Sequence, residues 1–319
     1  MDPVCHTLFG ATLASSGLGR RTAMATAALI VGANLPDVDA LTYFSTPMTD
    51  LAWRRGWTHG VLAVVLLPVL LSGALVLLHR LRARRNRAVS TLRFKQLLVI
   101  SFIAVLSHPI LDTLNTYGVR WLMPFSGRWF YGDALFIVDP WVWLMLAAGV
   151  FWSWLRQRTG ARQASRPARW ALTAFAVYAT AMWVAGSTAR QTISTEVEAS
   201  SGRQVLRAMA GPLPITVFAR SYVAEQGTMY RVGTVHLFRS NGKAGPRYTY
   251  PRGRPTHPAF AVAESTTSMR RFLGWARFPT FSVEEVGQGE YLVHVVDLRY
   301  AREPGHRFGS VTIPVSLPE

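Results

Sequence analysis

The chain has 319 residues, which is enough for one large domain or two ordinary ones. Half of the residues are hydrophobic and only 16% are charged, a balance that is rare in soluble globular domains. The net charge is +17, but the arginines cluster in short stretches between apolar runs. That distribution is typical of the cytoplasmic loops of a membrane protein and argues against a nucleic-acid partner.

Two short apolar segments come first, Val4–Leu18 and Thr22–Leu35. Both contain Gly, Ser or Thr, and at about 1.5 Å of rise per residue they would barely cross a bilayer. We therefore expect a helical pair that is partly buried among longer helices.

Four longer runs approach the roughly 20 apolar residues that a membrane-spanning helix needs. They are Val61–Leu78, Leu97–Asn115, Ile137–Leu155 and Trp170–Ser187. The sequence thus predicts an α-helical membrane domain over residues 1–188, with about four full transmembrane helices and the two shorter N-terminal segments.

The basic residues predict the orientation of these helices. Arginines crowd the links Arg80–Lys95 and Arg156–Arg169, and Arg20 and Arg21 join the first two segments, whereas residues 116–136 hold only two. Because Lys and Arg accumulate in cytoplasmic loops, the three basic links should lie on the cytoplasmic side of a bacterial inner membrane. The chain would then leave its last span on the extracytoplasmic side.

The pattern changes at about residue 189. Apolar residues alternate with polar ones in Ile215–Val223, Met229–Phe238, Tyr291–Tyr300 and Val311–Leu317, with Gly and Pro between them. Alternation of this kind predicts strands. We expect a β-rich, water-soluble extracytoplasmic domain over residues 189–319.

Ionisable residues in the membrane half are few and gather at one end of the predicted helices. No Glu precedes Glu196, and there are only seven Asp before it. Such residues are costly near a bilayer and usually functional. Those at the predicted outer end, in contrast to His79 at the inner end, are His6, Asp37, Asp39, His59, His108, Asp112 and Asp139.

The spacing of these residues suits a metal site. His108 and Asp112 are four residues apart and share a helix face, which Asn115 continues, and Asp37 and Asp39 share a side if the chain is extended. Imidazole and carboxylate together favour zinc, with manganese or iron as alternatives. Seven proposed ligands are more than one tetrahedral ion can bind. We therefore expect two ions, or one ion with a catalytic carboxylate among Asp37, Asp39 and Asp112.

Simpler interpretations exist for single members of this set. An interfacial Asp is often solvated or an N-cap, and Asp139 before Pro140 fits a cap well. Arg54 and Arg55 precede His59 and suit a phosphate or carboxylate of the substrate, as does Asn115, but the arginines would equally suit headgroup contact or a salt bridge to a site Asp.

Four stretches carry a resemblance to a known family: Met1-Asp-Pro-Val-Cys-His6-Thr-Leu-Phe-Gly10, Asn34-Leu-Pro-Asp37-Val-Asp39, Arg55-Gly-Trp-Thr-His59-Gly60 and His108-Pro-Ile-Leu-Asp112-Thr-Leu-Asn115-Thr-Tyr-Gly118. Together they resemble the YdjM-like family of predicted inner-membrane metal-dependent hydrolases, over residues 1–187. The resemblance implies a membrane-bound hydrolase without a known substrate. The set is also similar in kind to zinc phospholipase C and zinc nucleases, an analogy that favours phosphoesters.

The sequence therefore favours a metal-dependent hydrolase at the extracytoplasmic interface, with the lipid bilayer as partner and a phosphoester, phospholipid or other lipid-linked substrate. An ion or proton transporter is one alternative, but Val64–Leu71 and Leu97–Leu106 offer almost no polar groups for a path across the membrane. A non-catalytic scaffold with a structural metal is another, and closed coordination would favour it.

Overall fold

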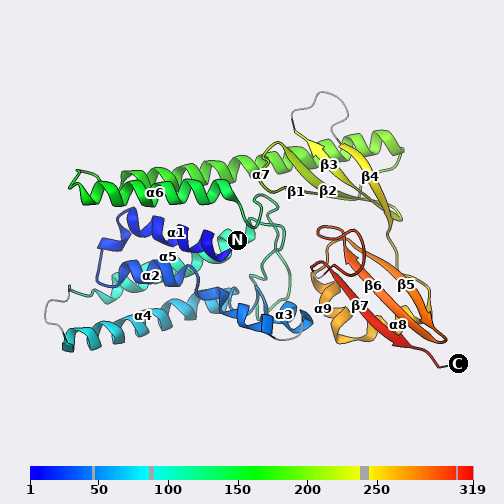
Figure 1. Cartoon of the computed structure of the whole chain (residues 1–319), viewed down its shortest axis with the longest axis horizontal. Helices are drawn as coiled ribbons and strands as arrows, with labels where there is room; N and C mark the ends of the chain where they lie inside the picture. Colours follow the sequence, from blue (N-terminus) through cyan, green and yellow to red (C-terminus); the bar gives the residue numbers. More distant parts are fainter. Residues whose placement is uncertain (45–46, 86–89, 238–243, 307, 319) are drawn as a thin grey trace. The chain divides into compact units, whose positions relative to one another are not determined.

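The computed structural model describes residues 1–44, 47–85, 90–237, 244–306 and 308–318. The chain divides into two compact units, one made of Met1–Ser45 and Trp53–Trp183, the other of Thr46–Ala52 and Val184–Glu319. The first is helical and the second is rich in β-structure, as the sequence predicts (Figure 1).

The N-terminal pair forms, in shorter pieces than predicted. Helix α1 covers Pro3–Ser15, a 3-10 turn covers Leu18–Arg20, and α2 covers Ala25–Gly32. Asp2 caps α1 by accepting hydrogen bonds from two backbone N–H groups of its first turn. A Cβ at Gly10 would lie 2.5 Å from the Leu29 carbonyl oxygen, so the missing side chain is what lets α1 and α2 approach closely.

Four longer helices follow: α4 (Val61–Arg85), α5 (Phe94–Thr113), α6 (Pro140–Arg158) and α7 (Arg166–Ser201). The last part of α7, from Val184, belongs to the second unit. Within the described residues, α4, α5 and α7 are long and apolar enough to cross a membrane. Helix α6 forms where a span was predicted, but it does not meet the same measure of length and hydropathy. Its crossing, and so the count of four spans, stays a prediction.

The core of this unit joins α2, α4 and α5 through apolar side chains that include Leu29, Leu71, Leu97 and Ala104. A Cβ at Gly32 would lie 2.8 Å from that of Ala104, so the end of α2 packs directly on α5. This contact brings the segment that follows α2 onto the last turns of α5. That segment is a ten-residue 3-10 helix, η2 (Leu35–Phe44), and a short helix α3 (Pro47–Trp53) follows.

The second unit holds two antiparallel sheets. The first has the order β1 (Arg207–Pro212), β2 (Ala219–Gln226), β3 (Met229–His236), β4 (Ala244–Pro251), and the second the order β5 (Pro279–Gly287), β6 (Glu290–Asp297), β7 (Ser310–Ser316). Helices α8 (Pro258–Ser265) and α9 (Thr267–Trp275) lie between the sheets in the chain. The predicted strand Ile215–Val223 begins late, at Ala219, because Ile215 has a φ of 67°, which is incompatible with a strand.

Helix α7 runs well past its predicted end at Ser187. Ala189, Ile193 and Val197 recur every fourth residue and pack against Tyr222 and Ala224 of β2. This apolar stripe has the helical period. The change of composition near residue 189 therefore falls inside a continuous helix. The secondary structure does not change at the domain boundary expected after residue 188.

Candidate metal centre

Helix α5 supplies two side chains of the site. His108 and Asp112 are one helical turn apart and both are fully buried. The spacing i, i+4 places them on one face, and the His108 Nε2 lies 3.5 Å from the Asp112 Oδ2. This part of the sequence prediction is confirmed.

His59 comes from the turn that precedes α4. Its ring is fully buried, with Nε2 3.4 Å from the Asp112 Oδ2 and 3.1 Å from the His108 Nε2. The turn requires glycine at position 60, because a Cβ there would lie 2.5 Å from the Met123 carbonyl oxygen. The backbone of residues 56–60 thus fits against the loop that follows α5 and holds His59 at its end.

Asp37 and Asp39 lie in η2 and serve different neighbours. The two carboxylates would share a side only in an extended segment; here the segment is a 3-10 helix, whose three residues per turn send positions i and i+2 in different directions. The Asp37 Oδ1 lies 3.5 Å from the His108 Nε2, whereas the Asp39 Oδ2 lies 3.3 Å from the Nδ1 of His59. The two carboxylates therefore contact opposite sides of the histidine pair.

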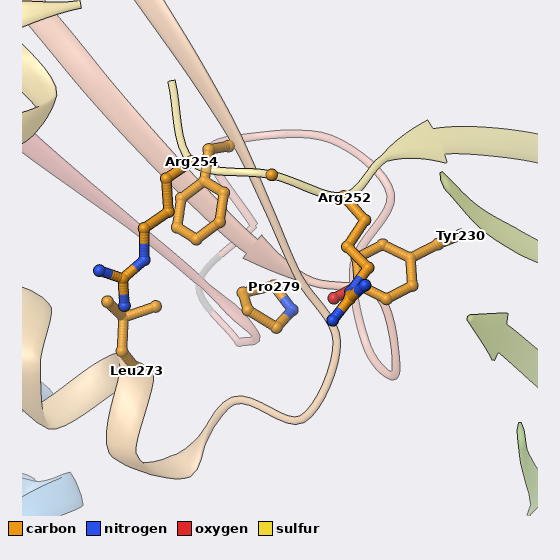
Figure 2. Close-up of a pocket in the computed structure, with 7 residues that line it drawn as sticks. Tyr230, Arg252, Arg254, Leu273 and Pro279 are labelled. Atoms are coloured by element: carbon orange, nitrogen blue, oxygen red, sulfur yellow. The ribbon is translucent and has the colours of Figure 1, made fainter. Parts of the chain in front are cut away.

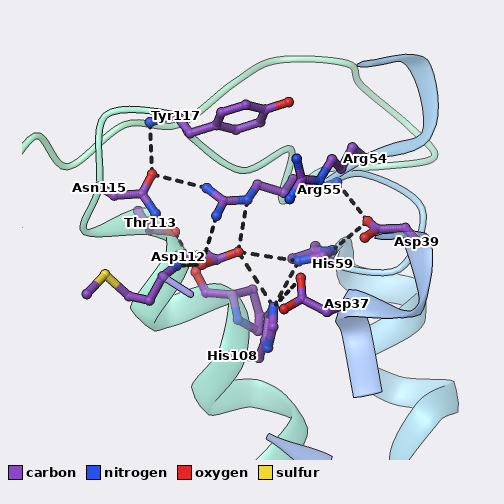
Figure 3. A network of polar contacts seen from close by, with 12 residues as sticks. Asp37, Asp39, Arg54, Arg55, His59, His108, Asp112, Thr113, Asn115 and Tyr117 are labelled. Carbon is purple, nitrogen blue, oxygen red and sulfur yellow. Dashed lines mark hydrogen bonds and ion pairs between the residues drawn. The ribbon is translucent and has the colours of Figure 1, made fainter. Parts of the chain in front are cut away.

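Four residues form a group that can hold one metal ion: Asp37, His59, His108 and Asp112, whose ligand atoms all lie within 4.8 Å of one another. Zinc bonds of about 2.0–2.1 Å in a tetrahedron separate ligand atoms by about 3.3 Å. Four of the distances in the group are 3.1, 3.4, 3.5 and 3.5 Å. The donor set and these distances suit a small divalent ion, and Figure 3 shows the four side chains converging within the network of polar contacts.

In each of the two rings, the nitrogen on the other side from Nε2 has a hydrogen-bond partner of its own. The His108 Nδ1 lies 2.7 Å from the Ala33 carbonyl oxygen, which can only accept, so Nδ1 carries the hydrogen. The His59 Nδ1 donates to the Thr58 hydroxyl, 2.9 Å away, while that hydroxyl donates to Asp39 at 2.8 Å. The two Nε2 atoms face each other across 3.1 Å, close to the separation of about 3.3 Å between two ligand atoms of a tetrahedral zinc ion.

Asp39 and Thr58 orient His59. The Asp39 Oδ2 also accepts a hydrogen bond from the backbone N–H of Arg55 at 2.9 Å. A carboxylate behind a metal-binding histidine fixes the tautomer and the ring orientation. Asp39 was predicted as a ligand; it is not among the four grouped residues, and its contacts are with His59, Thr58 and Arg55.

Arg55 is a salt-bridge partner of the site. Its guanidinium contacts both oxygens of Asp112, at 3.1 Å from Nε and 3.2 Å from Nη2, and donates from Nη1 to the Asn115 Oδ1 at 3.1 Å. The side chain is 2% exposed and lies over the Tyr117 ring. The salt bridge to a site Asp, one of the interpretations open at the sequence level, is thus present for Arg55, and Asn115 accepts a hydrogen bond from it. Substrate contact by Arg55 or Asn115 stays a prediction.

Arg54 lies at the edge of this network. Its guanidinium is 5.6 Å from the centre of the Tyr117 ring, and its backbone carbonyl accepts a hydrogen bond from Arg120. Tyr117 and Arg120 were not singled out from the sequence. Tyr117 lies in the motif that ends at Gly118, but no rule of residue spacing predicts the contacts of an aromatic side chain in a loop.

His6 approaches the cluster from α1. Its ring stacks on that of His108, with 3.7 Å between the centroids, and its Nε2 lies 3.3 Å from the Asp112 Oδ1. The amino group of Met1 contacts the same oxygen. His6 is fully buried, and neither ring nitrogen makes a hydrogen bond. It therefore faces the side of Asp112 that is turned away from His59.

The structure places Asp139 apart from the four grouped residues. Its Oδ1 accepts hydrogen bonds from the backbone N–H groups of Trp141 and Val142, and its Oδ2 accepts from the Tyr178 hydroxyl. These contacts are those of the N-cap of α6.

The charge states suit metal binding. Burial lowers the pKa of His59 to about 4, so its ring is neutral at neutral pH, as a ligand must be. Burial alone would raise the pKa of Asp37, but the hydrogen bond and charge of His108 outweigh it and hold that pKa well below its ordinary value. For Asp39, burial is likewise outweighed by contacts from His59 and Thr58, and its pKa is lowered.

The second unit has a pocket of its own, of about 410 Å³, whose lining includes Tyr230, Arg252, Arg254 and Pro279 (Figure 2). Both arginines already have acidic partners. Arg252 lies 3.0 Å from Glu225, and Arg254 lies 2.6 Å from Glu264. The positive charges of the two arginines in this pocket are therefore partly neutralised by Glu225 and Glu264.

Residues 1–190 match the model of a family described as YdjM inner membrane protein. The chain belongs to this family. This confirms the resemblance and the membrane setting, and it covers the whole of the candidate metal centre.

A curated relative is the uncharacterized protein YfhP of Bacillus subtilis (strain 168), which is 27% identical over 161 residues, or 48% of this chain. The chain thus spans about half the length of that relative, because the matched region is 46% of it. No solved structure matches the chain significantly.

Proposed function

We propose that this YdjM family member is a membrane-bound metal-dependent hydrolase. Its site works at the extracytoplasmic interface of the bacterial inner membrane, on a phosphoester or lipid-linked substrate. One observation carries the metal part of this proposal: the Nε2 atoms of His59 and His108 face each other across 3.1 Å, beside the carboxylates of Asp37 and Asp112. Two carboxylates complete the donor set, and imidazole with carboxylate favours zinc over manganese or iron.

When bound, a divalent ion supplies Lewis acidity, which polarises an ester and makes water a nucleophile at neutral pH. His59, His108 and Asp112 would hold it from the buried side. Arg55 balances the charge of Asp112 and fixes its two oxygens, so Asp112 is a ligand with little freedom to take up a proton.

Asp37 is the carboxylate best placed to meet substrate. Its side chain is 19% exposed, whereas those of His108 and Asp112 are fully buried. In this proposal Asp37 completes the ligand set at the open side and accepts a hydrogen bond or proton from the attacking water. Asp39 acts through His59, as a positioning residue.

His6 supports a second ion. The Asp112 Oδ1 lies 3.3 Å from the His6 Nε2, so these two residues would take part in holding a second ion. A second ion would help to stabilise the attacking and leaving oxygens of a phosphoester. The ratio of bound metal to protein would separate one ion from two.

Metal analysis of the detergent-purified protein tests this proposal. We expect bound zinc that a chelator removes, and metal-dependent hydrolysis of bis(p-nitrophenyl) phosphate. His59→Ala and His108→Ala should abolish both, whereas the matched variant His79→Ala should change neither, because position 79 lies twenty residues along the chain from His59, about 30 Å by helix rise. Equal metal content in all four proteins would contradict the proposed site.

A further inference from the structure

The cluster has one side that is open to its surroundings. His59, His108 and Asp112 are fully buried, while Asp37 keeps 19% of its side chain exposed. Any molecule that reaches the cluster must therefore come past Asp37. The character of the surface around Asp37 then indicates which class of molecule that is.

Asp37 also lines a shallow groove of about 470 Å³ along the end of α2 and the start of η2. Ile30, Val31, Leu35 and Val38 form most of its wall, and Asn34 lies beside Asp37. Val31 and Val38 are 46% and 48% exposed. The groove is therefore apolar along its length, with its polar groups gathered near the metal cluster.

The groove lies near the end of a candidate span. His108 precedes the last residue of α5, Thr113, by five residues, which is about 8 Å along the helix. Ala33, directly after α2, contacts the His108 ring, so α2 ends at the same level. At this depth the bilayer passes from hydrocarbon to headgroups, and acyl chains, not water, cover an apolar surface.

We propose that this groove holds an acyl chain of a lipid phosphoester, which enters sideways from the bilayer and presents its ester at Asp37. The proposal rests on the proposed function and names its substrate class. In the reaction, the oxygen of water bonds to phosphorus, the ester P–O bond breaks, and the leaving alkoxide takes up a proton. A free phosphate monoester has no chain to bury and would gain no binding energy from the apolar groove.

Filling the groove tests this proposal. Val31→Trp places a bulky ring in it, and the control Val99→Trp adds the same ring to an exposed position of α5 outside the groove, where Val99 is 58% exposed. The variants are compared in nanodiscs of phosphatidylglycerol and phosphatidylcholine. We expect both to keep their metal and their hydrolysis of bis(p-nitrophenyl) phosphate, while Val31→Trp loses phospholipid hydrolysis by at least about tenfold, through mispositioning of the ester.

Equal phospholipid turnover in the two variants would overturn the groove, as would hydrolysis of the soluble ester with no turnover of lipid by the wild type. If the metal-loaded wild type hydrolyses neither ester, the proposed function fails, and binding of the lipid is then measured separately.

Manganese in the site should broaden the nitroxide signal of a phosphatidylcholine that carries a nitroxide on its acyl chain. Broadening that Val31→Trp reduces supports the groove, and broadening that both variants retain overturns it.

Discussion

The guanidinium of Arg55 contacts both carboxylate oxygens of Asp112, with Nε 3.1 Å from Oδ2 and Nη2 3.2 Å from Oδ1. Asp112 is thereby fixed between a buried cation and the histidine pair. Arg55 itself has a φ of 50°, an unusual value for a residue with a side chain, so its backbone is held by its surroundings. Such positions are common where the geometry of a site depends on them.

Arg55→Lys should therefore weaken metal binding although it keeps the positive charge. Lysine is a point charge and cannot contact both oxygens in a planar fork, so Asp112 loses its orientation. Loss of an orienting partner of a ligand costs roughly 10–100-fold in metal affinity. Competition with a metal indicator in detergent measures it, and Arg54→Lys is the control, with little change expected. An unchanged affinity in Arg55→Lys would show that Asp112 needs no orientation.

Asp39→Asn separates the positioning role from that of a ligand. The amide can still accept from the Arg55 backbone N–H, but it removes the charge behind the His59 ring. We expect the protein to retain its metal at saturation, with affinity lowered by roughly 10–100-fold. Asp37→Asn should have the larger effect, because it removes a member of the ligand group. Complete loss of metal in Asp39→Asn would make Asp39 a ligand after all.

The sequence predicts the long helices well because they depend on one quantity, a run of apolar residues of sufficient length. It also places His108 and Asp112 on one face, since helical spacing is a local property. The end of α7 was harder to predict, because Ala189, Ile193 and Val197 lie in a stretch with fewer apolar residues. Their apolar stripe packs against the first sheet, and this contact cannot be derived from local sequence.

The division of roles within the site could not be derived from spacing. Asp37 and Asp39 look equivalent in the sequence, and only the 3-10 conformation of η2 sends one to His108 and the other to His59. Asp139 illustrates the opposite case. Its place before Pro140 is a local signal for an N-cap, and its hydrogen bonds in the structure are those of a cap.

Acid should destabilise the metal-free protein through His59. Burial lowers the pKa of this ring to about 4, whereas the unfolded chain titrates near 6.5, so below 6.5 the unfolded state binds the extra proton. The contribution to stability is therefore complete above about pH 6.5 and is lost as the pH falls towards 4. The thermal unfolding midpoint in detergent should drop between pH 7.5 and 5. His59→Gln should flatten this dependence and His79→Gln should not. Equal slopes in all three proteins would contradict the assignment.

The orientation of the membrane helices decides which side of the membrane the cluster serves. Arg80, Arg82, Arg84 and Arg85 lie at the end of α4 that is remote from His59, and the excess of such residues predicts a cytoplasmic location for that end. Cys5, the chain's one native cysteine, is buried, so single cysteines introduced elsewhere can be labelled selectively. In spheroplasts, an impermeant maleimide should label Thr256→Cys directly and Arg84→Cys only after permeabilisation. Labelling of both from the same side would contradict the predicted topology. Direct labelling of Arg84→Cys alone would place the cluster on the cytoplasmic face, and the substrate would then have to come from the inner leaflet.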